Sequence, residues 1–295
     1  MKKNNLKAWL YLLPAILFLG VFMIYPLADV VIYSLEESYD PVTGVVTSVG
    51  LGNFRKVLQD NLFIQALGNT FLLVAVTVPI STGLSLLIAL GLSSVKKLQK
   101  AFQTIYFLPY VTNTLAVGLV FTLLFGKIED HGLINTLLGT DYDFFIKTTD
   151  NHTLKMVVAS LYTIWIVMPF KILILTSALA SVNQDYYKAA RVDGASSARI
   201  FRKITLPMIS PTVFYLIITG FIGAFKAYSD EVALFGKDLT VSGMNTIVGY
   251  VYDKLYSSTG GAYGAASAAA LILFVIVLTI TVINLRFSRN KVQYM

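Results

Sequence analysis

Long runs without any charged residue constrain this chain more than any other feature of its sequence. A helix that crosses a lipid bilayer needs about 20 mostly apolar residues, and lipid offers no partner for a lone charge. Five runs meet this requirement and a sixth is interrupted only by Lys171: residues 8–28, 61–95, 101–126, 204–225, 255–285 and 156–184. Since 56% of the 295 residues are hydrophobic and the mean hydropathy is +0.71, one water-soluble core cannot bury all of these runs.

We therefore expect an all-α polytopic membrane protein with six transmembrane helices in a single domain over residues 1–295. The first run follows Lys2, Lys3 and Lys7 but continues past Pro26 without a small-residue cleavage pattern, so we interpret it as a retained helix and not as a signal peptide. The expected spans are residues 8–34, 64–93, 102–126, 155–179, 207–229 and 264–287.

The distribution of basic residues predicts the orientation of these helices. Fourteen lysines and arginines lie in the two terminal segments and in the connections that contain residues 96–100 and 188–203, whereas seven lie in the alternate connections. Because cytoplasmic connections carry the excess of Lys and Arg, we expect both termini in the cytoplasm. The sequence thus predicts a multi-pass protein of a bacterial cytoplasmic membrane, in contact with lipid. The net charge of +7 follows from this bias and indicates no nucleic-acid partner.

The residue types that the chain lacks exclude several classes of function. There is no cysteine, which excludes a disulfide, a thiolate metal site and a cysteine nucleophile, and the only histidines are His131 and His152. There is also no Gly-x-x-x-x-Gly-Lys-Ser/Thr motif to hold nucleotide phosphates. We expect no catalytic residue, no metal site and no cofactor in this chain, so any ATP and Mg²⁺ would be bound by another subunit.

The connection over residues 183–207 has a local pattern typical of two short helices. Asp185 is suited to cap the first helix, and Gly194 can turn the chain through positive φ at its end. Ser196 is suited to cap the second helix, and Pro207 is expected to end it. The pattern predicts a compact helical elbow on the cytoplasmic side.

Two kinds of surface are expected on this elbow. The first helix offers small side chains beside cations, at Lys188, Ala189, Ala190 and Arg191. The second offers apolar side chains at helical spacing that can pack against the transmembrane helices, at Ile200, Phe201 and Ile204. This combination favours a segment that docks on another subunit.

At these residues the chain resembles the membrane subunits of binding-protein-dependent ABC importers. Their cytoplasmic signature reads Glu-Ala-Ala, two residues, Asp-Gly-Ala, and later Ile-x-Leu-Pro. The matching positions are Ala189, Ala190, Asp193, Gly194, Ala195, Phe201, Ile204, Leu206 and Pro207. The first position, usually Glu in the family, is Lys188 here, so an ion pair from that glutamate to the ATPase is not carried over.

Other motifs resemble the carbohydrate-importing branch of this family. They are Tyr11-Leu-Leu-Pro14, Gly52-Asn-Phe54, Phe107-Leu-Pro-Tyr110, Trp165 with Pro169-Phe170, and Thr246-Ile-Val-Gly-Tyr250. The usual Leu-Thr-Gly-Gly-Pro after the fifth helix is degraded to Leu234-Phe-Gly-Lys-Asp238, which weakens the assignment to the branch but not to the family.

The resemblance implies a MetI-like fold of type I importers and a non-catalytic role in transport. It implies a paralogous permease subunit as heterodimer partner, a dimeric ABC ATPase, an extracellular solute-binding protein, and a sugar or oligosaccharide as substrate. It places the ATPase contact on Lys188, Ala189, Ala190, Arg191, Asp193, Gly194 and Ala195, and the packing of the segment on Phe201, Ile204, Leu206 and Pro207.

Polar residues within or near the spans are candidates for the substrate pathway, because sugars need hydroxyl partners and flat apolar faces. These candidates are Asn113, Thr114, Trp165, Lys226, Tyr228 and Asp230, with Tyr162 as a second aromatic platform. Each also has a structural interpretation: Lys226 and Asp230 can pair on one helix face, Asn113 can join helices, and Trp165 can pack. Lys171 can extend its aliphatic stem to the cytoplasmic surface.

Other classes of function stay open at this stage. The segment over residues 183–207 could instead lie on anionic lipid through its cations. The solute could be something other than a sugar. A secondary transporter would need coupling carboxylates at mid-depth or inverted repeats, and a membrane-embedded enzyme would need clustered acids or a Ser/His site. The sequence has none of these features.

Overall fold

The computed structural model describes most of the chain, namely residues 3–39, 46–95, 104–105, 108, 110–126, 133–139, 152–256 and 262–291. The chain forms two compact units. Unit 1 contains residues 1–64 and 249–275, and unit 2 contains residues 65–248 and 276–295.

Five helical stretches of the described residues are long and apolar enough to cross a membrane. They are Lys7–Leu35, Asn61–Ser94, His152–Ser181, Ser197–Phe225 and Tyr263–Arg286. The expected span at residues 102–126 lies partly outside the described residues, and its described part contains the shorter apolar helix α6, Thr114–Phe125.

Unit 1 begins with one continuous helical rod. The helix α1 (Lys3–Leu19) leads through a π-helical turn (Gly20–Ile24) into α2 (Tyr25–Leu35). No residue of its most apolar window is buried in this chain, and side chains such as Trp9 and Phe22 are exposed. An apolar surface of this extent fits a helix that faces lipid or another subunit.

A small hairpin follows, so the fold is not purely helical. Strands β1 (Glu36–Tyr39) and β2 (Val46–Val49) pair antiparallel, with Glu36 opposite Val49. The buried Asn53 of α3 (Gly52–Gln59) donates hydrogen bonds from Nδ2 to the carbonyl oxygens of Ser34 and Glu36, at 3.2 and 2.9 Å. This side chain therefore ties α3 to the end of α2.

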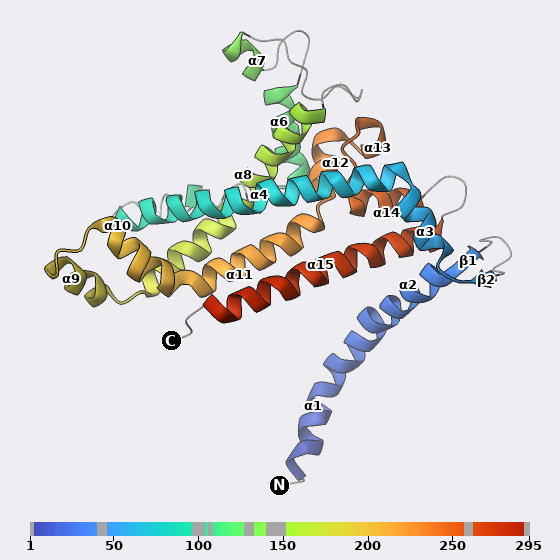
Figure 1. Ribbon diagram of the computed structural model, residues 1–295, viewed down its shortest axis with the longest axis horizontal. Coiled ribbons are helices and arrows are strands. Elements are labelled where there is room, and N and C mark those ends of the chain that lie inside the picture. Colours follow the sequence, from blue (N-terminus) through green and yellow to red (C-terminus); the bar gives the residue numbers. More distant parts are fainter. Residues whose placement is uncertain are drawn as a thin grey trace. The chain divides into compact units, whose positions relative to one another are not determined.

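Unit 2 contains the long helices α4 (Asn61–Ser94), α8 (His152–Ser181) and α11 (Leu206–Phe225), together with α6 and the short α7 (Leu133–Leu138). Between α11 and α15 (Tyr263–Lys291) the chain forms α12 (Ser229–Phe235), α13 (Leu239–Ser242) and α14 (Ile247–Leu255). In Figure 1, α9 (Gln184–Val192) and α10 (Ser197–Ile200) lie at the end of this unit opposite α12 and α13.

Two apolar clusters hold unit 2 together. One includes Phe121 of α6, Tyr162 of α8 and Leu234 of α12, and the edge of the Phe121 ring meets Tyr162 at 5.1 Å between centroids. The other joins α4, α8 and α11 around Leu175 and Leu216. Partly buried Tyr187 of α9 packs against this second cluster, which fixes α9 to the long helices.

Polar groups connect the long helices to the segment between α12 and α14. The buried Asn69 of α4 donates hydrogen bonds of 2.9 Å from Nδ2 to the carbonyl oxygens of both Gly243 and Asn245, and its Oδ1 lies 2.8 Å from Nε2 of His152. The Nζ atom of buried Lys155 donates to the carbonyl of Ser242 at 2.8 Å. Backbone groups that helices leave unpaired are thus satisfied by side chains.

Candidate functional site

The first candidate site is the segment over residues 183–207, which we call the coupling segment. Its helix α9 begins at Asn183, whose Oδ1 accepts a hydrogen bond of 2.9 Å from the backbone N–H of Asp185. The prediction that Asp185 caps this helix is therefore wrong. Asp185 lies in the first turn instead, where its carboxylate accepts a 2.9 Å hydrogen bond from Nζ of Lys188. Both side chains are well exposed, so this ion pair adds little stability.

Gly194 ends α9 as expected, at a φ of +73°. The N–H of Ala195 donates to the carbonyl of Ala190 at 2.9 Å, and the N–H of Gly194 donates to the carbonyl of Arg191 at 3.0 Å. This pair of bonds is the Schellman motif, which needs a left-handed residue that glycine adopts without strain. The turn between α9 and α10 therefore has a defined geometry.

No residue of α9 is buried, although the helix is anchored at Tyr187. The predicted contact residues Lys188, Ala189, Arg191, Asp193 and Gly194 are exposed, and Ala190 and Ala195 are half-buried. The apolar side chain of Val192 is 88% exposed. A free surface of this kind, apolar and basic, is suited to contact another protein.

Pro207 does not end the second helix as predicted. Ser196 caps α10 through a 3.4 Å hydrogen bond to the N–H of Arg199, and α10 continues through a π-helical turn (Phe201–Thr205) directly into α11. The N–H of Leu206 bonds to the carbonyl of Phe201, one residue further back than in an α-helix. Because this turn shifts the hydrogen-bond pattern just before the proline, which lacks an N–H, the helix passes Pro207 without a break.

The predicted packing residues of the segment, Phe201, Ile204, Leu206 and Pro207, are all half-buried. The hydroxyl of buried Thr205 donates to the hydroxyl oxygen of Tyr187 at 3.2 Å, so α9 is tied to the π turn. The surface elbow is therefore attached to the membrane-spanning α11 both through the backbone and through a side-chain contact.

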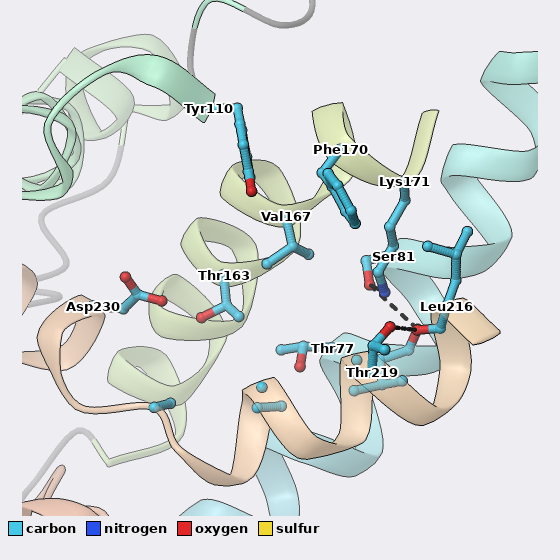
Figure 2. A pocket seen from close by; sticks show the side chains of 15 residues that line it. Thr77, Ser81, Tyr110, Thr163, Val167, Phe170, Lys171, Leu216, Thr219 and Asp230 are labelled. Atoms are coloured by element: carbon cyan, nitrogen blue, oxygen red, sulfur yellow. Dashed lines mark hydrogen bonds between the residues drawn. The ribbon is translucent and has the colours of Figure 1, made fainter. Parts of the chain in front are cut away.

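The second candidate site is a cavity of about 210 Å³ inside unit 2, which we call the inner cavity (Figure 2). Three helices line it at helical spacing, so each presents one face. The lining residues are Thr77, Val78 and Ser81 of α4; Thr163, Val167, Phe170 and Lys171 of α8; Leu216, Thr219, Gly220, Gly223 and Ala224 of α11; and Tyr110, Ala227 and Asp230.

Glycine and alanine residues on α11 leave the space for this cavity. Gly220, Gly223 and Ala224 lie on one face of α11, and Ala227 follows just after the helix ends. A Cβ atom at Gly223 would meet nothing within 4 Å, whereas one at Gly220 would lie 3.2 Å from Cγ1 of Val78 and 3.4 Å from Nζ of Lys171. Larger residues on this face would fill the cavity.

The polar groups of the inner cavity lie at two ends. Figure 2 shows Lys171 and Ser81 on one side, and Asp230 near Thr163 on the other. The rings of Tyr110 and Phe170 stack at 5.6 Å between centroids on its wall. Lys171 does not reach a surface as predicted: it is 4% exposed, and its Nζ donates to Ser81 Oγ at 2.7 Å and to Thr82 Oγ1 at 2.9 Å.

Of the six predicted pathway residues, only Asp230 lines the inner cavity. Asn113 caps α6 by accepting from the N–H of Leu115 at 2.8 Å, and the carbonyl of Thr114 accepts from the hydroxyl of Tyr162 at 3.0 Å. Trp165 packs against Phe121 at 5.6 Å between ring centroids. These three residues therefore have structural roles in this arrangement, and Tyr162 is fully buried.

Lys226 and Asp230 do not share a helix face. Exposed Lys226 ends α11 and Tyr228 precedes α12, in which Asp230 lies. Among the described residues, the ion pairs include none between Lys226 and Asp230. Burial raises the pKa of Asp230 above its ordinary value.

Glu231 is the next residue and is fully buried, with no hydrogen-bond partner for either carboxylate oxygen among the described residues. Burial and the neighbouring Asp230 raise the pKa of Glu231 to about 8. This carboxyl is therefore mostly protonated at neutral pH.

Most residues of the inner cavity escaped the sequence analysis because they belong to uncharged or nearly uncharged runs. Thr77, Ser81, Thr163 and Thr219 are single hydroxyls among apolar residues, and a one-dimensional sequence does not show which helix faces meet. Two lining residues do stand out in the sequence: Lys171, the only charge in the run over residues 156–184, and Asp230.

The chain is similar to known proteins over most of its length. Residues 81–292 match a protein family described as the binding-protein-dependent transport system inner membrane component. The arabinooligosaccharides transport system permease protein AraP of Bacillus subtilis is 30% identical over 281 residues, which cover 95% of this chain and 88% of that protein. The lactose transport system permease protein LacF of Rhizobium radiobacter is 28% identical over 95% of this chain and 92% of its own length.

A solved structure has the same fold. A chain of a bacterial alginate ABC transporter, in complex with an alginate pentasaccharide-bound periplasmic protein, superimposes with a TM-score of 0.80. The alignment covers 98% of this chain and 96% of that chain, at 24% sequence identity.

Proposed function

Since the chain belongs to the family of inner membrane components of binding-protein-dependent transport systems, we propose that it is a pore-forming permease subunit of an ABC importer for a sugar or oligosaccharide. Two of its relatives are named as permeases for arabinooligosaccharides and for lactose, which supports this class of solute. The inner cavity, with hydroxyl groups and stacked aromatic rings on its walls, has the chemistry that binds a sugar ring.

The proposal that this segment docks on the ATPase depends on one observation. The surface of α9 is exposed, whereas the Schellman turn at Gly194 and the hydrogen bond between Thr205 and Tyr187 fix the position of the helix. A segment that only covered the bundle would bury its apolar side chains, yet Val192 is exposed. We assign the contact with the ATPase to Lys188, Ala189, Ala190, Arg191, Asp193, Gly194 and Ala195. Since Lys188 replaces the usual glutamate, its partner on the ATPase should be an acid or a backbone carbonyl.

The continuous helix from α10 to α11 supports a mechanical role for this contact. When the ATPase subunits close on ATP, the displacement of α9 passes to the half-buried Phe201, Ile204, Leu206 and Pro207 and then along α11. Because α11 lines the inner cavity, its tilt changes access to that cavity. A flexible connection in the same place would absorb the displacement.

An ATP-driven transport cycle needs further subunits besides this chain. One coupling segment fills one of two sockets on a dimeric ATPase, so a paralogous permease subunit completes the pore. The ATPase binds ATP and Mg²⁺, and an extracellular solute-binding protein delivers the sugar. The excess of basic residues in alternate connections supports a cytoplasmic position for both termini and for the coupling segment.

Cysteine cross-linking tests this proposal directly, because the chain has no cysteine of its own. Ala189→Cys on α9, alkylated with a benzophenone maleimide, should photo-cross-link to the ATPase subunit in the assembled transporter. Leu137→Cys, which is at a 73% exposed position on α7, is the matched control and should form none. Cross-linking of Leu137→Cys alone, or of Ala189→Cys only to lipid, would contradict the assignment.

Measurements of ATP-driven uptake by variants of the docking surface test whether the contact with the ATPase is needed for transport. Ala190→Arg adds a bulky cation to the docking surface, and Gly194→Pro removes the N–H that bonds to Arg191 and forbids the positive φ. Both should abolish ATP-driven uptake while the subunits still reach the membrane. Uptake that runs on a proton or sodium gradient without the ATPase would instead identify a secondary transporter.

A further inference from the structure

Within the described part of the chain, the ammonium group of Lys171 is buried without a counter-charge. Lys171 is 4% exposed in the middle of α8, and its described hydrogen-bond acceptors are the neutral hydroxyls of Ser81 and Thr82. Among the described residues, no carboxylate forms an ion pair with it. Burial of an unpaired cation at membrane depth is costly, and such residues usually face a functional cavity.

The surroundings of Lys171 leave its head group room to meet a ligand. An ammonium has three N–H donors, and two are used by Ser81 and Thr82. Gly220 on α11 lies against the same Nζ atom, where even a Cβ would come within 3.4 Å. A larger residue at position 220 would cover Nζ and close this end of the inner cavity.

Two further groups in the inner cavity are also incomplete. The hydroxyl oxygens of Thr77 and Thr163 are buried and have no hydrogen-bond partner among the described residues, and both threonines line the cavity. Buried hydroxyls are normally paired, so these positions are suited to the hydroxyl groups of a solute. Together with the Tyr110 and Phe170 rings, they fit a polyhydroxylated ring.

A neutral sugar would satisfy the two threonines but would leave the charge of Lys171 uncompensated. Asp230 does not compensate it, since it lies on the other side of the cavity (Figure 2). On the basis of the proposed importer function, we infer that the transported solute is an acidic sugar, whose carboxylate or phosphate group pairs with Lys171 in the inner cavity. Hydrogen bonds between charged groups are roughly twice as strong as neutral ones, so this contact also selects the solute.

The test uses the complete transporter, with its partner permease, ATPase and binding protein, in proteoliposomes. Trigalacturonate represents a carboxylated sugar, galactose 6-phosphate a phosphorylated one, and arabinotriose a neutral one. We expect ATP-dependent uptake of an anionic solute, and the panel decides between carboxylate and phosphate. Uptake of the neutral trisaccharide alone would overturn the inference and leave the importer function intact, whereas ATP-independent behaviour with all three would refute the importer function itself.

Variants at position 171 isolate the charge. Lys171→Gln keeps hydrogen bonding but removes the charge, and should lower uptake of the anionic solute about 10- to 100-fold at sub-saturating concentration. Lys171→Arg keeps the charge and should retain at least ten times the uptake of Lys171→Gln. Equal losses in both variants would show that Lys171 only holds α4 to α8, and would overturn the inference.

Lys155→Met is the matched control for loss of a buried ammonium. Lys155 lies on the same helix and is fully buried, but it bonds to the carbonyl of Ser242 and does not line the inner cavity. Uptake per assembled complex should therefore stay within about twofold of the wild type. A loss as large as that of Lys171→Gln would point to a structural effect of both lysines and count against the inference.

Discussion

The hydroxyl of Tyr250 donates a 2.8 Å hydrogen bond to Oδ2 of Asp60, and Nζ of Lys254 lies 3.0 Å from the same oxygen. The two elements that meet here, α14 and the start of α4, are far apart in sequence but belong to unit 1. Burial raises the pKa of Asp60, but hydrogen bonds from Tyr250, Lys254 and the N–H of Leu62 outweigh this effect and lower the pKa below its ordinary value of 3.8. The carboxylate is therefore charged at neutral pH.

Tyr250→Phe should cost about 1–2 kcal/mol of stability at pH 7, because it removes a hydrogen bond to a charged group. A depressed pKa contributes stability above the unfolded value that is lost as pH falls through the folded value, so the loss should shrink below about pH 4. Thermal unfolding of the purified protein measures it. Tyr256→Phe, at a 77% exposed position, is the control and should leave the melting temperature unchanged. Equal shifts in both variants would contradict the role of this hydrogen bond.

Asn69 should be one of the most sensitive polar positions of unit 2. Its amide makes three contacts, with the carbonyls of Gly243 and Asn245 and with His152. Asn69→Ala leaves buried carbonyls unpaired, and should cost about 2–4 kcal/mol. Asn113→Ala removes only the cap of α6 and should cost about 1 kcal/mol. Thermal unfolding compares the two, and a larger loss at Asn113 would show that Asn69 does not hold this segment.

Gly194→Ala should loosen the coupling segment without a steric clash. A Cβ at Gly194 meets nothing within 4 Å, but alanine at a φ of +73° costs about 1–2 kcal/mol. Hydrogen exchange of the Gly194 and Ala195 amides should become faster. Gly91→Ala, in the interior of α4 and also with open space around its Cβ, is the control and should be neutral or stabilising. Unchanged exchange at Gly194→Ala would mean that the Schellman turn does not set the geometry.

Glu231 should make the stability of the protein depend on pH in the opposite sense to Asp60. With a pKa raised to about 8, the folded protein keeps a proton that the unfolded chain releases near pH 4.5, so stability falls as pH rises between these values. Glu231→Gln stays neutral and should gain stability relative to the wild type, from about zero at pH 5 to on the order of 3 kcal/mol near pH 8. Melting temperatures at both pH values measure this gain. A difference that does not change with pH would contradict the buried neutral carboxyl.

The sequence predicted the family and the helical membrane fold correctly, because both depend on local signals. Uncharged runs mark spans whatever they pack against, and Gly194 marks a left-handed turn by its missing side chain. Local signals failed where two residue types compete for one role. Asn183, and not Asp185, caps α9, since both side chains suit a cap and only the backbone conformation decides between them.

Tertiary contacts explain the other differences from the sequence analysis. A proline usually ends a helix, but the π-helical turn before Pro207 lets the helix continue through this residue. Lys171 is buried because Ser81 and Thr82 of α4 accept hydrogen bonds from its ammonium group, and because Gly220 of α11 leaves space beside Nζ. Among the predicted pathway residues other than Asp230, Asn113 caps α6 and Trp165 packs against Phe121. Which polar side chains share a cavity depends on helix rotation, which the sequence does not encode locally.

The small residues at positions 220, 223 and 224 of α11, and at position 227 just after it, also bear on how importers of this type diverge. Each methyl group added to this face subtracts volume from the chamber without altering a backbone hydrogen bond, and alanine is favoured over glycine inside a helix. A lineage could therefore exchange one cargo for another through single-nucleotide changes, while the coupling segment, which we propose to contact the ATPase, stays untouched at the other end of the same helix.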